Sequence, residues 1–166
     1  IKYGNRKINR CILDNRFKDN NYLVFNTSIA NIVITEENND IVSINFTKKS
    51  IKSSKSTLLN KAKLEIKEYL NKNRKIFSFD VFPKGTPFQY LVWQEIKKIS
   101  YGSTKSYMDL AKILNTSPRA IGNACAQNKC LILIPCHRIV STTGKLLGFS
   151  ALGGTKTKKQ LITIEK

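Results

Sequence analysis

The chain has 166 residues, 41% of them hydrophobic, and a formal net charge of +18 at pH 7. This length suffices for one large hydrophobic core or two small ones, and no apolar run approaches the roughly 20 residues of a membrane-spanning helix. The excess of lysine and arginine indicates a polyanionic partner, nucleic acid before an anionic membrane, although a lysine-rich genome composition would also raise the charge.

Runs of β-forming residues dominate the first part of the chain. Residues 22–25, 29–34 and 41–46 are predicted to be strands. The polar residues 36–40 separate the last two runs and predict a hairpin-like turn. We therefore expect a small sheet in this part of the chain.

A helix and a break in the pattern follow the predicted strands. Residues 58–70 place apolar side chains at helical spacing, with lysines on the other face, and residues 76–82 form one more extended run. Residues 83–85 then interrupt the pattern with a proline and a glycine. We expect a boundary here between a domain over residues 1–80 and a domain over residues 81–166.

The second part opens with a strong helix-start signal. Thr86 is the predicted N-cap, Pro87 occupies the first helical position, and Gln89 completes a capping box. The apolar spacing that follows predicts a helix that ends at Tyr101 and Gly102.

Two shorter helices are predicted next. Ser106 marks one helix start, and Ser117 with Pro118 marks another, for a helix from about residue 119 to residue 127. Two short helices joined by a tight turn are typical of a helix-turn-helix. Gly122 within the second helix costs roughly 1 kcal/mol relative to alanine, so we expect a close approach there, either to a ligand such as DNA or to a packed helix.

Acidic residues become scarce towards the C-terminus. The net charge is +8 over residues 1–80 and +10 over residues 81–166, and the second part holds only three acidic side chains. Because a surface that faces DNA tolerates negative charge poorly, the second part is the expected DNA-binding part.

The cysteines and the N-terminus exclude other classes of protein. Cys11, Cys125, Cys130 and Cys136 have no Cys-x-x-Cys spacing, and the chain has a single histidine, so we expect no metal site. A disulfide framework is also not expected in a cytosolic chain of this size. Residues 1–6 are not followed by the apolar core of a signal peptide, which favours a cytoplasmic protein.

The single histidine directly follows a cysteine, as Cys136-His137. Histidine commonly converts a thiol into the nucleophilic thiolate near neutral pH. The apolar residues 131–134 predict a buried strand, from which Pro135 would turn the sulfur outward. The alternative is a buried structural cysteine beside an incidental histidine.

Six motifs in the second part occur in a recognisable order. They are Gly85–Gln89, Val92–Gln94, Tyr101–Tyr107, Arg119–Ala124, Gln127–Asn128 and Ile134–Arg138. Together they resemble the O6-alkylguanine-DNA alkyltransferase family, also called methylated-DNA–protein-cysteine methyltransferases. Residues 1–79 match that family only in length and in the order of strands and helix.

The resemblance implies a fold, an activity and a partner. The fold would be α+β with two domains, a small N-terminal sheet with a flanking helix and a mostly helical, winged-helix-like C-terminal domain with a helix-turn-helix. The activity would be irreversible, single-use transfer of an alkyl group from O6-alkylguanine to a cysteine, without a cofactor. The partner would be double-stranded DNA, bound by a monomer through the minor groove, with the damaged base flipped out.

The motif match implies a role for each of several residues. Cys136 would accept the alkyl group, and His137 would be the general base, acting through a water and oriented by Glu165. Tyr107 would donate a proton to the leaving guanine. The residues implied in DNA binding are Arg119, which would intercalate, Ala120, Gly122 and Tyr107; Asn128 would be the hinge, and Pro135, Phe149 and Ser150 would belong to the substrate pocket.

Several of these assignments have a structural alternative. Tyr107 could simply pack at a helix start, Arg119 could hold a phosphate, and Glu165 could be a solvated C-terminal residue. Phe149 stands where many members of the family carry tyrosine. Members that bind zinc in the N-terminal domain use cysteine and histidine, and this chain has only Cys11 there. Cys125, Cys130 and Trp93 are expected to be packing residues.

Two other functions remain open at this point. A non-catalytic DNA-binding protein, either a helix-turn-helix regulator or an alkyltransferase-like damage sensor, would share the motifs, but such sensors lack the reactive cysteine that Cys136 matches. A cysteine hydrolase would use the same Cys-His pair but needs an oxyanion site, which nothing in the sequence marks.

Overall fold

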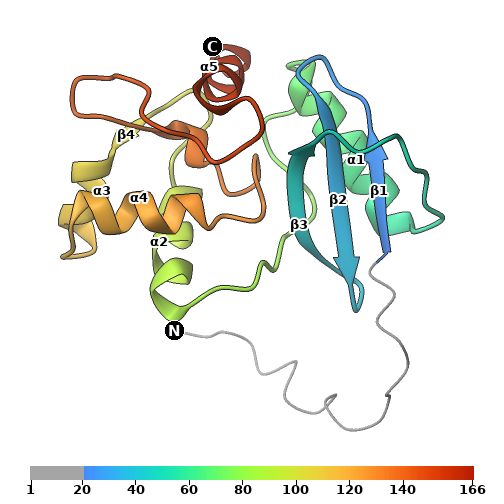
Figure 1. The fold of residues 1–166 in the computed structure, drawn as a ribbon, viewed down its shortest axis with the longest axis horizontal. Helices are drawn as coiled ribbons and strands as arrows, with labels where there is room; N and C mark the ends of the chain where they lie inside the picture. Colours follow the sequence, from blue (N-terminus) through green and yellow to red (C-terminus); the bar gives the residue numbers. More distant parts are fainter. Residues whose placement is uncertain (1–20) are drawn as a thin grey trace, which may run out of the picture.

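The computed structural model describes residues 21–166 (Figure 1). Cys11 and the N-terminal segment considered for a signal peptide lie outside the described residues. The predicted α+β class is confirmed: a three-stranded antiparallel sheet with one helix is followed by four helices and a two-stranded parallel sheet. None of the helices in residues 21–166 is long and apolar enough to cross a membrane.

The three predicted strands form one sheet. Strand β1 spans Asn21–Phe25, β2 spans Asn31–Glu37 and β3 spans Asp40–Thr47, in the order β1-β2-β3. The predicted hairpin turn is at Asn38 and Asn39, whose φ angles of 52° and 62° match the left-handed conformation that two-residue hairpin turns require.

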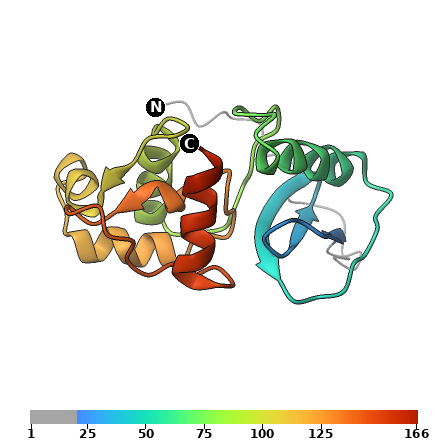
Figure 2. The same cartoon turned by 90° about the horizontal axis from the view of Figure 1, so that it is seen from above.

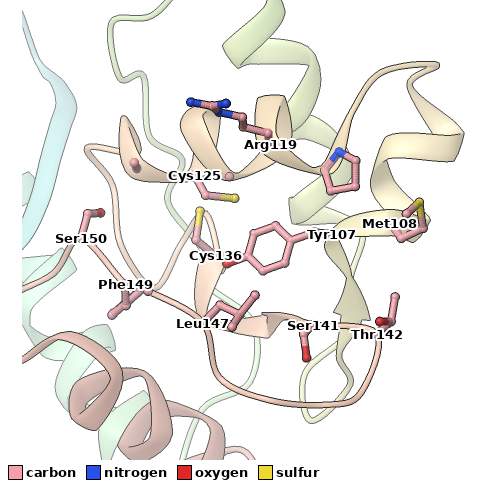
Figure 3. A pocket seen from close by; sticks show the side chains of 14 residues that line it. Tyr107, Met108, Arg119, Cys125, Cys136, Ser141, Thr142, Leu147, Phe149 and Ser150 are labelled. Atoms are coloured by element: carbon pink, nitrogen blue, oxygen red, sulfur yellow. The ribbon is translucent and has the colours of Figure 1, made fainter.

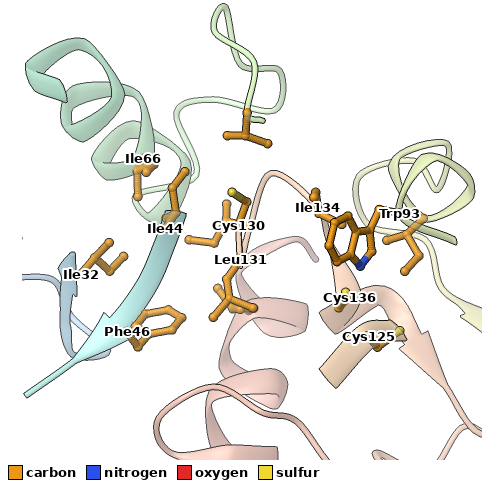
Figure 4. Packing of buried hydrophobic residues seen from close by; sticks show 14 of the residues in the cluster. Ile32, Ile44, Phe46, Ile66, Trp93, Cys125, Cys130, Leu131, Ile134 and Cys136 are labelled. Atoms are coloured by element: carbon orange, nitrogen blue, oxygen red, sulfur yellow. The ribbon is translucent and has the colours of Figure 1, made fainter. Parts of the chain in front are cut away.

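Helix α1, Thr57–Leu70, covers one face of this sheet (Figure 2). Ser56 caps its N-terminus by accepting a hydrogen bond from the backbone N–H of Leu59. Apolar side chains of the helix, among them Ile66, are buried against the sheet residues Ile32 and Ile44 in the core (Figure 4).

The extended run over residues 76–82 pairs with the sheet at only one point. The backbone N–H of Phe82 donates to the carbonyl of Ile41 over 2.8 Å. Further upstream, Ser78 is held by the side chain of Glu65 instead, through its backbone N–H and its hydroxyl. Since a side chain satisfies this backbone, the segment is a connection between α1 and the next helix rather than a full strand.

Helix α2, Pro87–Lys97, begins as predicted and ends earlier than predicted. Thr86 and Gln89 form the expected capping box, with hydrogen bonds of 2.9 and 3.2 Å. At the other end, the N–H groups of Lys98 and Ile99 bond to carbonyls three residues back. This tightening ends the helix before Tyr101.

The helix-turn-helix is present. Helix α3 spans Tyr107–Ile113 and α4 spans Pro118–Ala126, and Ser106 and Ser117 cap them as predicted. Asn115 in the turn has a φ of 50°. Strand β4, Lys105–Ser106, pairs in parallel with β5, Ile139–Val140, and helix α5, Gly154–Ile164, lies near the C-terminus of the chain.

The predicted buried strand at Leu131–Ile134 is wrong: the segment is buried but forms consecutive turns, with a φ of 74° at Ile132. The cause is Asn128, whose side chain accepts from the N–H of Cys130 at 2.9 Å and donates to the carbonyl of Ile134 at 2.8 Å. A side chain thus replaces the sheet partner that this backbone would otherwise need.

The edge of β3 holds the start of this segment. The N–H of Ile44 donates to the carbonyl of Lys129 at 2.8 Å, and the N–H of Leu131 donates back to Ile44 at 2.9 Å. Apolar side chains from both parts of the chain then pack in one cluster (Figure 4). The sheet and the helix-turn-helix lie on opposite sides of this cluster (Figure 1). The domain boundary between residues 80 and 81 stays a prediction.

Candidate active site

A pocket of about 690 Å³ opens between α3, α4 and the loop over residues 141–150 (Figure 3). Cys136 lies in its wall and is only 4% exposed. Tyr107 and Arg119 contribute from the two helices, and Phe149 and Ser150 from the loop. Its size and mostly apolar walls are typical of a pocket that binds a small organic molecule.

Cys136 begins a short 3₁₀ helix, η1, Cys136–Arg138. Its Sγ lies 3.1 Å from Nδ2 of Asn128, which also donates to the carbonyl of Ile134. Asn128 directly follows the end of α4, so one buried amide links that helix to the segment that carries the thiol. Pro135, immediately before Cys136, is buried but is not among the residues that line the pocket.

His137, the next residue after Cys136, is completely buried. Its Nε2 lies 2.7 Å from Oε1 of Glu165, whereas its Nδ1 has no hydrogen-bond partner among the described residues. Burial lowers the pKa of His137 and outweighs the neighbouring Glu165 carboxylate, which raises it. A neutral imidazole with a free lone pair can accept a proton.

Glu165 is buried and is not the solvated C-terminal residue considered as an alternative. It accepts three hydrogen bonds from Arg138, Nε to Oε2 at 2.9 Å, Nη2 to Oε1 at 2.8 Å and Nε to Oε1 at 3.2 Å. Burial raises the pKa of Glu165. The hydrogen bonds from His137 and Arg138 together lower it by more than burial raises it, so the pKa is well below its ordinary value. The carboxylate is therefore ionised.

Cys125 on α4 lies opposite Cys136, and the two sulfur atoms face each other in Figure 3. Its thiol and complete burial raise the pKa of Cys136 well above the ordinary value, while the hydrogen bond with Cys136 lowers the pKa of Cys125. Two neighbouring thiols cannot both carry a negative charge, so the pair holds one thiolate at most.

Tyr107 borders the pocket together with a buried amine. Nζ of Lys158, a fully buried residue of α5, donates to the hydroxyl of Tyr107 at 3.3 Å and to the carbonyl of Leu147 at 3.2 Å. Burial, followed by the two cysteines, raises the pKa of Tyr107 to about 12, and burial lowers the pKa of Lys158. The phenol is thus a neutral hydrogen-bond donor near neutral pH.

The first turns of α4 face outward beside the pocket. Arg119 is exposed and Ala120 is half-buried. A Cβ added at Gly122 would meet only Cε1 of Tyr107, at 4.0 Å, which is an ordinary contact. Packing within the described residues therefore does not require glycine at this position, and the contact of Gly122 with DNA stays a prediction.

Within residues 21–166, no group of three or more His, Cys, Asp and Glu side chains could hold a metal ion.

Relatives of this chain carry consistent names. The description "6-O-methylguanine DNA methyltransferase, DNA binding domain" belongs to a family model that matches residues 87–166. The constitutive methylated-DNA–protein-cysteine methyltransferase of Bacillus subtilis is 32% identical over 159 residues, which cover 89% of this chain and 96% of the relative. The chain belongs to this methyltransferase family.

Other comparisons agree with this assignment. The methylated-DNA–protein-cysteine methyltransferase of Methanosarcina acetivorans is 31% identical, over 87% of this chain and 97% of the relative. The crystal structure of the O6-methylguanine methyltransferase of Mycobacterium tuberculosis superposes with a TM-score of 0.77 at 25% identity, over 87% of this chain and 92% of that one. A structure of the same Mycobacterium tuberculosis protein in complex with DNA matches equally well.

The sequence motifs of this methyltransferase missed two residues of the site. Tyr69 on α1 contacts Glu165, and no motif marks the first 79 residues. Lys158 precedes Leu161 by three residues and Glu165 by seven, a spacing that places all three on one face of α5 and its C-cap. That spacing could have revealed it, but the many other lysines of this chain conceal the signal.

Proposed function

We propose that this methyltransferase repairs DNA by moving an alkyl group from O6 of guanine directly to Sγ of Cys136. The observation that carries the proposal is the buried Cys136, at the wall of a pocket that opens beside the exposed start of α4. The product is a thioether, which the site has no means to reverse. Each molecule therefore reacts once.

The first step is the formation of the thiolate. Nδ1 of His137, the residue next to Cys136, has a lone pair without a hydrogen-bond partner among the described residues. We infer that this nitrogen takes the proton of Cys136 through a bridging water. Glu165 keeps the other nitrogen protonated. Nδ2 of Asn128, 3.1 Å from Sγ, stabilises the negative charge on Cys136.

The second step is the displacement at the alkyl carbon. The thiolate attacks this carbon, the bond from carbon to O6 breaks, and its electron pair goes to the guanine. The base leaves as a neutral molecule if it takes a proton, and Tyr107 is placed to donate one. Lys158 then stabilises the resulting phenolate through its hydrogen bond to the Tyr107 oxygen.

We infer that double-stranded DNA binds along α4, through its minor groove, with the damaged base turned into the pocket. Arg119 at the start of α4 would fill the space that the base leaves. The three acidic side chains of residues 81–166 are all occupied: Glu95 pairs with Lys98, Asp109 caps α3, and Glu165 is buried. No free carboxylate among them opposes the DNA backbone.

Mass spectrometry tests the proposal. After mixing with duplex DNA that contains O6-methylguanine, the protein should gain one methyl group, located on Cys136 and not on Cys125 or Cys130. Cys136→Ala should gain none and still bind the duplex. Turnover above one methyl group per protein would contradict single-use transfer, and DNA binding without any methylation would indicate a damage sensor.

A further inference from the structure

Tyr69 brings a hydroxyl group from α1 into the site, 68 residues before His137 in the chain. Its side chain is fully buried. The hydroxyl donates to Oε1 of Glu165 at 2.6 Å and lies 3.3 Å from Nε2 of His137. We propose that Tyr69 is a positioning residue for alkyl transfer, which fixes the tautomer and the orientation of His137. This inference rests on the proposed function.

The protonation states around the hydroxyl follow from its neighbours. Burial, and then the Glu165 carboxylate, raise the pKa of Tyr69 far above its ordinary value, so the phenol keeps its proton. An ionised carboxylate only accepts hydrogen bonds, and the single proton of Tyr69 therefore points to Oε1. The oxygen of Tyr69 keeps its lone pairs free towards His137.

Nε2 of His137 is thus surrounded by acceptors. Oε1 of Glu165 lies at 2.7 Å and the hydroxyl oxygen of Tyr69 at 3.3 Å. Both favour a proton on Nε2, and a neutral imidazole then has its lone pair on Nδ1. That nitrogen is the one without a partner among the described residues, and it is the one that must accept the proton of Cys136.

The hydrogen bond of Tyr69 also moderates the charge of Glu165. Arg138 already donates to both carboxylate oxygens. Lys158 is the other charged group that acts on His137, and Cys136 is its titratable neighbour in the sequence. When Tyr69 loses its hydroxyl, Oε1 becomes more negative and stabilises the imidazolium form. The pKa of His137 should therefore rise, and less neutral base is present below that pKa.

The ring of Tyr69 is held independently of the hydroxyl. Its centroid lies 5.6 Å from that of Phe77 and 6.0 Å from that of Tyr101, the second pair edge to face at 90°. Tyr69→Phe keeps these ring contacts. Tyr101→Phe is a matched control, because the hydroxyl of Tyr101 donates to the backbone carbonyl of Ile164 and makes no hydrogen bond with the carboxylate.

The experiment measures the rate of benzyl transfer from free O6-benzylguanine between pH 5.5 and 9, in the full chain. For Tyr69→Phe, the low-pH limb of the profile should shift to higher pH by about one pH unit. At any pH below the pKa of His137, this shift is a tenfold loss of neutral imidazole. Tyr101→Phe should keep the wild-type profile. A uniform loss at every pH, or equal shifts in both variants, would overturn the proposal.

Nitrogen NMR gives a readout that does not depend on alkyl transfer, since His137 is the only histidine in the chain. The wild-type imidazole should carry its proton on Nε2, and Tyr69→Phe should become protonated at a higher pH. A wild-type proton on Nδ1, or identical titrations of the two proteins, would overturn the role of Tyr69. If Tyr69→Phe does not fold, a wild-type proton on Nδ1 would still overturn the proposal. If the NMR results are as expected but no benzyl group reaches Cys136, the proposed function fails instead.

Discussion

Cys125 is the neighbouring side chain that raises the pKa of Cys136 the most. It lies one helix turn before Asn128, and its thiol is the largest cause of the raised pKa of Cys136, ahead of burial. The two thiols together carry at most one negative charge, so a thiolate on Cys125 prevents Cys136 from being ionised and reacting.

Cys125→Ala should therefore react faster at neutral pH. Removing the neighbouring thiol lowers the pKa of Cys136 towards its ordinary value, which increases the thiolate fraction and moves the alkaline rise of the rate to lower pH. The measurement is benzyl transfer from free O6-benzylguanine across pH 6 to 10. Cys130→Ala is the control, because Cys130 is buried away from the pocket beside Val42. An unchanged profile in Cys125→Ala would show that the two thiols do not interact.

Among the secondary-structure elements, the starts of the helices could be predicted from the sequence, whereas the turns at residues 131–134 could not. Thr86, Ser106 and Ser117 cap their helices through bonds to residues three positions on, so the necessary chemistry is local. The turns at Leu131–Ile134 depend on the side chain of Asn128, which no propensity of apolar residues indicates. Apolar composition alone predicted burial correctly and the strand wrongly.

Some residues of the candidate site could likewise be predicted from the sequence, and one could not. Cys136, His137 and Glu165 could be proposed from motifs near the C-terminus, and the structure brings the histidine and the carboxylate within 2.7 Å. Their catalytic roles stay predictions. Tyr69 could not be found, because it reaches Glu165 across 96 residues of sequence from a helix that carries no motif. Contacts of that range depend on the packing of the whole chain.

Arg119 allows a test of α4 as the DNA-binding element. Arg119→Ala should slow repair of O6-methylguanine in duplex DNA much more than reaction with free O6-benzylguanine, because a free base needs no flipping. The measurement is the ratio of the two rates. Lys112→Ala, an exposed charge on α3, controls for the loss of one positive charge. Equal losses with both substrates would count against a role of Arg119 in replacing the flipped base.

At the scale of the whole molecule, the site joins the two halves of the structure. The edge of β3 holds residues 129–131 through two backbone hydrogen bonds, and Tyr69 of α1 contacts Glu165 beyond α5. Asn128 lies between these connections and α4, and it contacts the reactive sulfur itself. A change at Cys136 can therefore reach both the sheet and the DNA-binding helix.

Alkylation should lower the stability of the protein. Cys136 is 4% exposed, and its Sγ contacts Asn128 and Cys125 at the wall of the pocket. A group added to Sγ should displace these two side chains, and one methylene-sized insertion into a packed site commonly costs about 1–3 kcal/mol. A thioether also has no S–H group, so Cys136 can no longer donate to Cys125 after alkylation. Since total stability is typically about 5–15 kcal/mol, the change is large enough to measure.

The comparison uses unreacted, methylated and benzylated protein in one buffer. The melting temperature should fall on methylation and fall further with the larger benzyl group, and the affinity for undamaged duplex DNA should fall in the same order. Cys136→Ala treated with the same reagents is the control and should melt at one temperature throughout. Because Asn128 would transmit the strain, Asn128→Ala should be less stable before reaction and lose less DNA affinity on alkylation. Melting temperatures that stay constant or rise in both alkylated forms would mean that the pocket accommodates the group without moving the segment around Asn128.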